Sequence, residues 1–236
     1  MKETSENLDL YKTSYKCDKC KDLGIILDEN NKAKAYCECY IKDRIETMSK
    51  KSNMKFKHFT FKNFDDSRSE YSKKLKDVAT KYYKEFNQVK DKRSNSIAFL
   101  GQPGSGKTHI AGALANNLFQ KRNVFVLYVE YIELSTMYKQ RFNNIEYQST
   151  IDKSKKADVL FIDDLLKCKP TESDRELLMN IVNHRYINNL PMIISSENTI
   201  DDIRRFDEAL GGRIYEMCKN YIVEIERDIK LDNRLK

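Results

Sequence analysis

The stretch that decides the fold runs from Ser96 to Arg122, SIAFLGQPGSGKTHIAGALANNLFQKR. Its first six residues are largely apolar and predict a short strand, whereas residues 109–122 have helical character. Between them, residues 101–108 match the pattern G-x-x-x-x-G-K-[ST] in full. Glycines in such a loop let backbone N–H groups turn inward around phosphate oxygens. The stretch therefore predicts a phosphate-binding loop, and the flanking strand and helix make a chance glycine-rich turn the weaker alternative.

The loop residues have expected roles in binding a nucleoside triphosphate. Lys107 should reach the β- and γ-phosphates, and the Thr108 hydroxyl should bind Mg²⁺. The N-terminus of the helix that follows adds its partial positive charge. The expected ATP-binding residues are Gly101, Gln102, Pro103, Gly104, Ser105, Gly106, Lys107 and Thr108.

A second acidic element should complete the magnesium site. The segment DVLFIDD, residues 158–164, is an apolar strand that ends in two carboxylates. We expect Asp163 to hold Mg²⁺, through water, and Asp164 to orient or deprotonate the attacking water. The alternative is an ordinary strand end with solvated acids. Its position some fifty residues after a complete phosphate loop favours the metal site.

Strand and helix patterns alternate through the C-terminal two thirds of the chain, which predicts an α/β fold. Apolar strands without polar alternation, separated by helices, indicate a parallel sheet covered on both faces. We expect a five-stranded parallel sheet between helices. The predicted strands cover 96–101, 124–129, 158–163, 191–196 and 221–226, and the predicted helices 70–90, 109–122, 131–142, 172–188 and 199–219.

Two further positions suit an ATPase that senses its nucleotide. Ser196 ends the strand at 191–196, so it could lie beside the attacking water, although Ser196, Asn198 or Thr199 could equally be a helix N-cap. Arg213 follows two glycines, and an arginine can stabilise a transferring phosphoryl group from a neighbouring subunit. Residue chemistry alone favours a surface arginine at a helix break.

The order of these motifs resembles the AAA+ ATPases, specifically the DnaC/DnaI-type replicative helicase loaders. The resemblance covers about residues 90–236: the phosphate loop, IDD, PMIISS, DEALGGRI and a C-terminal DNR that contains Arg234, whose role stays open. It implies that Arg213 is the trans-acting arginine and that no C-terminal lid domain is present. It also implies contacts with single-stranded DNA over residues 131–157, through Lys139, Arg141, Lys153, Lys155 and Lys156. Glu197 departs from the family, where many relatives place Asn, so the sensor could be Ser196 or Glu197.

Four of the six cysteines lie close together near the N-terminus. Cys17 and Cys20 form one pair, Cys37 and Cys39 form a second pair, and sixteen residues separate the two pairs. Four thiolates close a tetrahedral zinc site, and short-spaced pairs lower the entropy cost of assembling it. The alternative is four reduced cysteines in a small core. Similarity to the loaders of the Gram-positive type, whose zinc-binding N-terminal domain contacts the helicase, agrees with zinc.

Composition restricts the class of protein further. No apolar run approaches a membrane span, and the first twelve residues lack an apolar stretch, so we expect a cytoplasmic protein without a disulfide framework. The net charge of +7 is uneven, since residues 40–93 carry 16 basic and 8 acidic side chains. That surplus suits nucleic acid or an acidic partner, and equally a solvated helix face.

These observations divide the 236 residues into a zinc module at 1–50, a basic, partly helical connector at 51–93 and an ATPase domain at 94–236. The leading hypothesis is an ATP-dependent loader that places a hexameric replicative helicase on DNA and self-associates through its ATPase domain. The alternative is an IstB-type helper of a transposase. A nucleotide-dependent adaptor without hydrolysis is a third possibility, against which the intact Lys107, Thr108, Asp163 and Asp164 set argues.

Overall fold

A computed structural model gives the structure of the chain and describes residues 15–53, 55, 58–141 and 145–226. The chain divides into two compact units, Met1–Met48 and Ser49–Lys236. The C-terminal DNR motif with Arg234 lies outside the described residues.

The first unit contains a short hairpin and the start of a helix. Strands β1 (Ile25–Leu27) and β2 (Ala33–Tyr36) pair antiparallel, and α1 (Glu38–Lys51) follows directly. Asp28 closes the hairpin because its side chain accepts hydrogen bonds from the backbone N–H groups of Asn30 and Lys32, both at 2.9 Å. The patterns in the sequence did not predict this hairpin, whose strands are too short to show an alternation.

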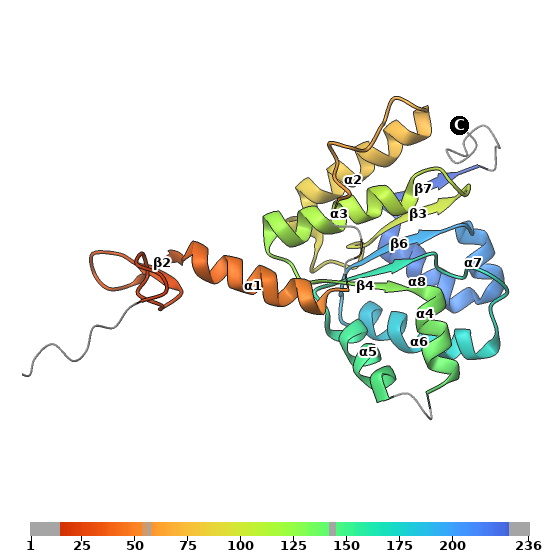
Figure 1. Cartoon of the computed structure of the whole chain (residues 1–236). Helices are drawn as coiled ribbons and strands as arrows, with labels where there is room; N and C mark the ends of the chain where they lie inside the picture. The colour runs from red at the N-terminus through yellow and green to blue at the C-terminus, as the bar shows by residue number, and fades with distance from the viewer. Residues whose placement is uncertain (1–14, 54, 56–57, 142–144, 227–236) are drawn as a thin grey trace, which may run out of the picture. The chain divides into compact units, whose positions relative to one another are not determined.

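The second unit is built on a five-stranded sheet with the strand order β4-β5-β6-β3-β7 (Figure 1). Each pair of neighbouring strands in this sheet is parallel. This confirms the expected α/β fold with a five-stranded parallel sheet. Its strands are β3 (Ile97–Gly101), β4 (Val126–Glu130), β5 (Val159–Asp163), β6 (Met192–Ser196) and β7 (Ile222–Ile225).

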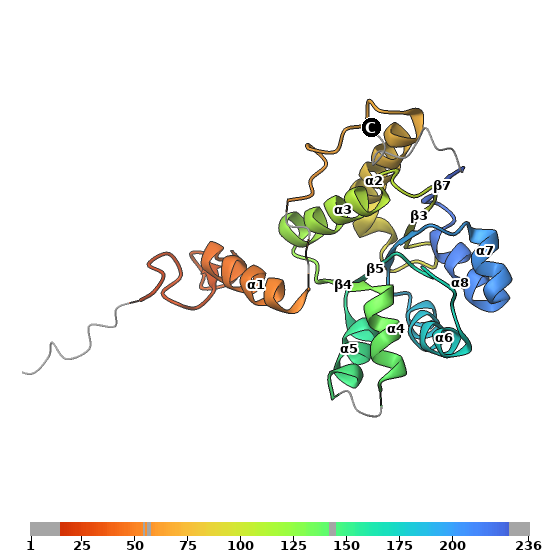
Figure 2. The same ribbon diagram turned by 45° about the vertical axis from the view of Figure 1, so that its right-hand side comes forward.

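Helices cover both faces of this sheet (Figures 1 and 2). On one face lie α2 (Glu70–Val89) and α3 (Lys107–Arg122). On the other face lie α4 (Tyr131–Lys139), α5 (Ile145–Lys156), α6 (Glu172–Ile187) and α8 (Glu208–Cys218), and α7 (Ile200–Phe206) packs on α8. None of the helices within the described ranges is long and apolar enough to cross a membrane.

Alternation along the strands assigns each side chain to one helical layer. Leu127, Leu160 and Ile194 belong to the core with the layer of α4, α6 and α8. Since successive strand residues point to opposite faces, Tyr128, Phe161 and Ser195 face the layer of α3. This alternation decides which polar side chains reach the site at the start of α3.

Two predicted helices have different bounds in the structure. The segment expected to be helical over 131–142 ends as α4 at Lys139. The segment expected over 199–219 is two helices, because Asp207 adopts an extended conformation and its side chain caps α8 by accepting a 2.7 Å hydrogen bond from the Leu210 N–H.

A buried arginine joins three segments near the amino ends of strands β5 and β6. Arg185, on α6, has 0% exposure, and its guanidinium donates to the backbone carbonyls of Ser154 (2.8 Å), Ala157 (3.0 Å) and Pro191 (2.7 Å). These carbonyls belong to the end of α5, the approach to β5 and the approach to β6. Arg185 therefore supplies buried donors to carbonyls at the end of α5 and ahead of β5 and β6, and ties these three segments together.

Candidate nucleotide and metal sites

The phosphate loop joins the carboxyl end of β3 to α3 and requires glycine at both of its ends. Gly101 has φ +96°, and a Cβ there would lie 2.0 Å from the backbone oxygen of Ile225. Gly106, the N-cap of α3, has φ +93°, a left-handed conformation that L-residues with side chains rarely adopt. The loop is thus a tight cradle at a helix N-terminus, which fits a bound phosphate chain.

The Lys107 side chain is folded into this loop. It has 6% exposure, and its Nζ donates to the carbonyl oxygens of Gly101 at 2.8 Å and Gln102 at 2.6 Å. The Ser105 hydroxyl also donates to Gln102 O, at 2.8 Å. The structure therefore places the charge of Lys107 where phosphates in the cradle would meet it.

Asp163 and Thr108, the two predicted magnesium ligands, are in direct contact. The Thr108 hydroxyl donates to Asp163 Oδ1 at 2.9 Å, and the Ser195 hydroxyl donates to the same oxygen. Burial raises the pKa of Asp163, and these hydroxyl donors oppose the increase. Hydroxyl and carboxylate oxygens with this spacing form a suitable donor set for Mg²⁺.

Asp164 has a different environment from its neighbour. It adopts φ +55°, and its carboxylate pairs with Lys167 Nζ at 2.6 Å. Its backbone N–H donates a hydrogen bond to the Ser195 hydroxyl oxygen at 3.0 Å. Lys167 also lies 3.9 Å from Glu197, so one ammonium group connects both acids. Lys167 was not recognised in the sequence, where nothing distinguishes it from other surface lysines.

Ser195, the neighbour of the predicted sensor Ser196, makes the contact with Asp163. Ser196 faces the other helical layer, where its hydroxyl donates to Leu165 O at 2.6 Å. Thr199, and not Ser196, is the N-cap of α7. The role of Ser196 as the nucleotide sensor therefore stays a prediction. Ser195, which contacts Asp163, is a site residue that the sequence analysis missed.

Arg213 lies within α8 and not at a helix break, because Gly211 and Gly212 are themselves helical. Its Nη1 donates to Ala209 O at 3.1 Å, and its guanidinium lies 5.6 Å from the Tyr186 ring centroid. Among the contacts made by the described residues, none joins Arg213 to the phosphate loop of its own chain. A role in a neighbour's site stays a prediction.

Aromatic side chains of the connector pack against the start of α3. The Phe59 ring stacks on His109 with centroids 4.3 Å apart, and Phe64 meets His109 edge to face at 5.3 Å. Asn63 Oδ1 lies 3.1 Å from His109 Nε2. Residues 59–64 therefore form one wall beside the phosphate loop.

The four paired cysteines come together in the first unit. Cys17 Sγ lies 3.7 Å from Cys37 Sγ, Cys20 Sγ lies 3.4 Å from Cys39 Sγ, and all four sulfurs are within 4.8 Å of one another. A tetrahedral zinc with Zn–S bonds of about 2.3 Å places its sulfurs about 3.8 Å apart, so the donor set fits zinc. A backbone hydrogen bond from Cys20 lowers the pKa of Cys17 to about 7, whereas the side-chain hydrogen bond with Cys20 raises the pKa of Cys39 to about 12, so of these two thiols only Cys17 is biased toward the thiolate.

The five predicted DNA-binding side chains lie in two groups, one at the end of α4 and one in the last turn of α5. Arg141 stacks on Tyr138 at 4.4 Å, and Tyr138 contacts Tyr147 near the start of α5. Lys139 pairs with Asp174 at 3.4 Å. Lys153, Lys155 and Lys156 occupy the last turn of α5, about 9–14 Å along that helix from Tyr147. Contact with DNA stays a prediction for both groups.

The fold and the site define a class: a P-loop ATPase of the AAA+ type, with Lys107, Thr108 and Asp163 at the carboxyl edge of a parallel sheet. Residues 5–215 match the family model of the IstB-like ATP-binding proteins, and the chain belongs to that family.

Named relatives and a solved structure agree with this assignment. YqaM of Bacillus subtilis, an uncharacterized protein, is 42% identical over 208 residues, which cover 84% of the chain and 66% of YqaM. The phage-like element PBSX protein XkdC of B. subtilis is 39% identical over 222 residues, which cover 90% of the chain and 83% of XkdC. The crystal structure of the DnaC helicase loader superposes with a TM-score of 0.58 at 23% identity, over 66% of the chain and 90% of DnaC.

Proposed function

We propose that this protein is an ATP-dependent loader that delivers a replicative helicase onto DNA when replication begins. The observation that carries the proposal is the pairing of an AAA+ ATPase centre, of the fold also found in the DnaC helicase loader, with a separate module that holds four clustered cysteines. The relative XkdC belongs to a phage-like element, which fits a loader role. Work in the cytoplasm follows from that role.

ATP would bind with its phosphates in the cradle of residues 101–108. Lys107 neutralises phosphate charge, and Thr108 with Asp163 would hold Mg²⁺, whose charge stabilises the transferring phosphoryl group. Asp164 lies next to this centre and accepts from Lys167. We assign to Asp164 the orientation of the attacking water and acceptance of its proton. Arg213 would complete the site of a neighbouring subunit after self-association.

The zinc module would bind the helicase through exposed apolar side chains. With zinc on Cys17, Cys20, Cys37 and Cys39, the hairpin and the start of α1 are held as one unit. Leu23 is 64% exposed and Tyr36 is 60% exposed, and the Tyr36 ring stacks on Tyr40 with centroids 5.1 Å apart. Exposed aromatic and aliphatic groups of this kind anchor protein–protein interfaces.

The IstB-type role in transposition is the second hypothesis from the sequence, and it is not favoured. A transposase helper shares the ATPase centre, so residues 101–108 and Asp163 do not separate the two functions. The four-cysteine module and the fold of the DnaC loader support the helicase as partner.

A pull-down with the full chain tests the proposal. Immobilised wild-type protein should retain the replicative helicase of its host and not a transposase from the same genome. Metal analysis of the wild type should find about one zinc ion per chain. A variant with both Cys37→Ser and Cys39→Ser should lose the zinc and should no longer retain the helicase. Retention of the transposase alone would support the alternative, and a folded wild type without metal would exclude the zinc site.

Surface variants give a matched control for the same pull-down. Leu23→Ser with Tyr36→Ser should keep zinc and lose most of the helicase. Ile187→Ser removes a side chain that is similarly exposed, at 62%, from the ATPase unit and should leave retention unchanged. Equal retention by both variants would contradict the assigned surface.

A further inference from the structure

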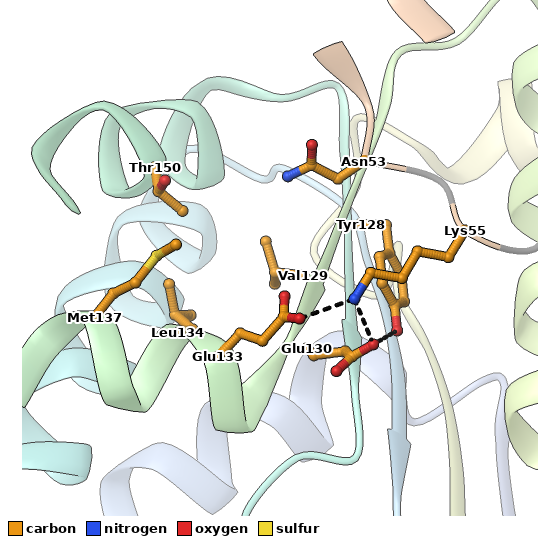
Figure 3. Close-up of a pocket in the computed structure, with 9 residues that line it drawn as sticks. All are labelled: Asn53, Lys55, Tyr128, Val129, Glu130, Glu133, Leu134, Met137 and Thr150. Atoms are coloured by element: carbon orange, nitrogen blue, oxygen red, sulfur yellow. Dashed lines mark hydrogen bonds and ion pairs between the residues drawn. The ribbon is translucent and has the colours of Figure 1, made fainter. Parts of the chain in front are cut away.

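The phenol of Tyr128 lies between two carboxylates of different function. Its hydroxyl oxygen is 3.3 Å from Asp163 Oδ2. The same oxygen is 3.0 Å from Glu130 Oε1, a contact drawn in Figure 3. The ring is 1% exposed and meets Phe161 edge to face at 5.2 Å, so its position is fixed by packing. Tyr128 therefore presents a rigid donor to the carboxylate that would hold Mg²⁺.

The Asp163 carboxylate is oriented by hydroxyls from three elements. Thr108 on α3 and Ser195 on β6 donate to Oδ1, whereas Tyr128 on β4 lies against Oδ2. The parallel register brings this about, because Glu130 pairs with Asp163 and Tyr128 lies two residues earlier on the same face. Removal of the phenol hydroxyl would leave Oδ2 without this donor.

Lys55 of the connector controls the other acceptor of Tyr128. Its Nζ lies 2.9 Å from Glu130 Oε1 and 2.8 Å from Glu133 Oε1 (Figure 3). All three side chains line a pocket of about 310 Å³ between the connector, the end of β4 and α4. The positive charge of Lys55 makes Glu130 a weaker acceptor for the phenol proton.

One hydroxyl carries one proton, so Asp163 and Glu130 compete for it. The phenol oxygen lies nearer Glu130, at 3.0 Å, than Asp163, at 3.3 Å, although Lys55 is paired with Glu130. We propose that Tyr128 is a positioning residue for the Mg²⁺-holding carboxylate of Asp163, and that the Lys55–Glu130 ion pair limits the pull of Glu130 enough to keep the hydroxyl shared with Asp163. Displacement of Lys55 would let Glu130 draw the hydroxyl away. The connector would thereby set the Mg²⁺ response of the site. This inference rests on the magnesium role of Asp163 in the proposed function.

Nucleotide binding with and without Mg²⁺ tests the first half of the inference. The affinity for a fluorescent, non-hydrolysable ATP analogue is measured in Mg²⁺ and in EDTA. Tyr128→Phe should keep the EDTA affinity and lose roughly tenfold of the gain that Mg²⁺ provides. Tyr131→Phe is the matched control, because that buried tyrosine interacts with Asp174 instead, and its Mg²⁺ gain should equal that of wild type.

A double variant tests the second half. Lys55→Met should lower the Mg²⁺ gain as Tyr128→Phe does, and adding Glu130→Gln should restore it, because a neutral amide competes less for the phenol proton. A Tyr128→Phe protein with the wild-type gain, or with weakened binding in EDTA as well, would overturn the inference. So would a double variant without rescue or a wild type without Mg²⁺ gain. Helicase retention is measured separately, so the loader role can be refuted while the positioning role of Tyr128 is still supported.

Discussion

At the scale of single residues, the two consecutive carboxylates have separate surroundings, which fit the separate roles proposed for them. Asp163 is 5% exposed and surrounded by hydroxyl donors, which suits a group that holds a metal ion in one orientation. Asp164 points elsewhere, because its left-handed backbone conformation turns it toward Lys167. Its side chain is 32% exposed, so water can reach it. The geometry therefore supports binding by the first acid and proton transfer by the second.

Asp164→Asn should separate binding from hydrolysis. An amide keeps the shape but cannot accept a proton, and loss of a positioned base costs about 10²–10⁴-fold in rate. ATP affinity should stay within a few-fold of wild type, whereas Lys107→Ala should lose productive ATP binding. Equilibrium nucleotide binding and phosphate release measure the two effects. Asp158→Asn, at the other end of the same segment, is the control, and unchanged turnover in Asp164→Asn would refute the role.

At the scale of elements, α7 and α8 pack unusually close to each other at Gly211. A Cβ on Gly211 would lie 2.5 Å from Arg204 Cγ and 2.8 Å from the Arg204 backbone N and Cα. The next residue, Gly212, has no atom within 4 Å of a Cβ. The two glycines before Arg213 therefore have different effects. Gly211 permits the close contact between α7 and α8, whereas Gly212 lies on the outer surface of α8, where a side chain would meet open space.

Gly211→Ala and Gly212→Ala should change stability in opposite directions. The first substitution forces two helix backbones apart, which costs about 1–3 kcal/mol as overpacking does elsewhere. The second replaces an open helical glycine by the best helix former and should stabilise the fold by up to about 1 kcal/mol. Thermal unfolding of the full chain measures both. A Gly211→Ala protein as stable as Gly212→Ala would show that the α7–α8 contact is looser than described.

Which of these features the sequence could predict depends on whether they are local. The phosphate loop and the strand that ends at Asp163 are confirmed, because each is encoded within about ten consecutive residues. Ser195 was missed because Ser195 and Ser196 are equally polar in the sequence. Which of the two contacts Asp163 is decided by the face of the sheet that is turned toward α3. Arg185 was missed because its carbonyl partners lie up to 31 residues away, at Ser154. Asp207, by contrast, carried an N-cap signal that the continuous helical pattern obscured.

At the scale of the whole molecule, the role proposed for Arg213 requires subunits to share sites. Arg213 has no contact with the loop of its own chain among the described residues, and the resemblance to AAA+ loaders assigns it to a neighbour. A lone subunit would then be a weak ATPase, because arginine fingers supplied in trans contribute roughly 10³–10⁵ to turnover in other enzymes. Helicase or single-stranded DNA should raise the activity by bringing subunits together.

Mixing two inactive variants tests this sharing. Arg213→Ala keeps an intact loop, and Lys107→Ala keeps an intact arginine, so each should be inactive alone. An equimolar mixture with helicase present should regain part of the stimulated ATPase rate at hybrid interfaces. If the mixture stayed inactive while both variants still bound the helicase, the shared site would be wrong.

Loading of the helicase onto closed circular single-stranded DNA tests whether this protein is a helicase loader. A ring-shaped helicase cannot thread onto a circle without ends, so its arrival requires a loader. Wild-type protein with ATP should deposit helicase that stays on the circle after a high-salt wash, and Lys107→Ala should deposit none. Helicase on the circle in equal amounts with wild type and with Lys107→Ala, or none with either, would contradict the account.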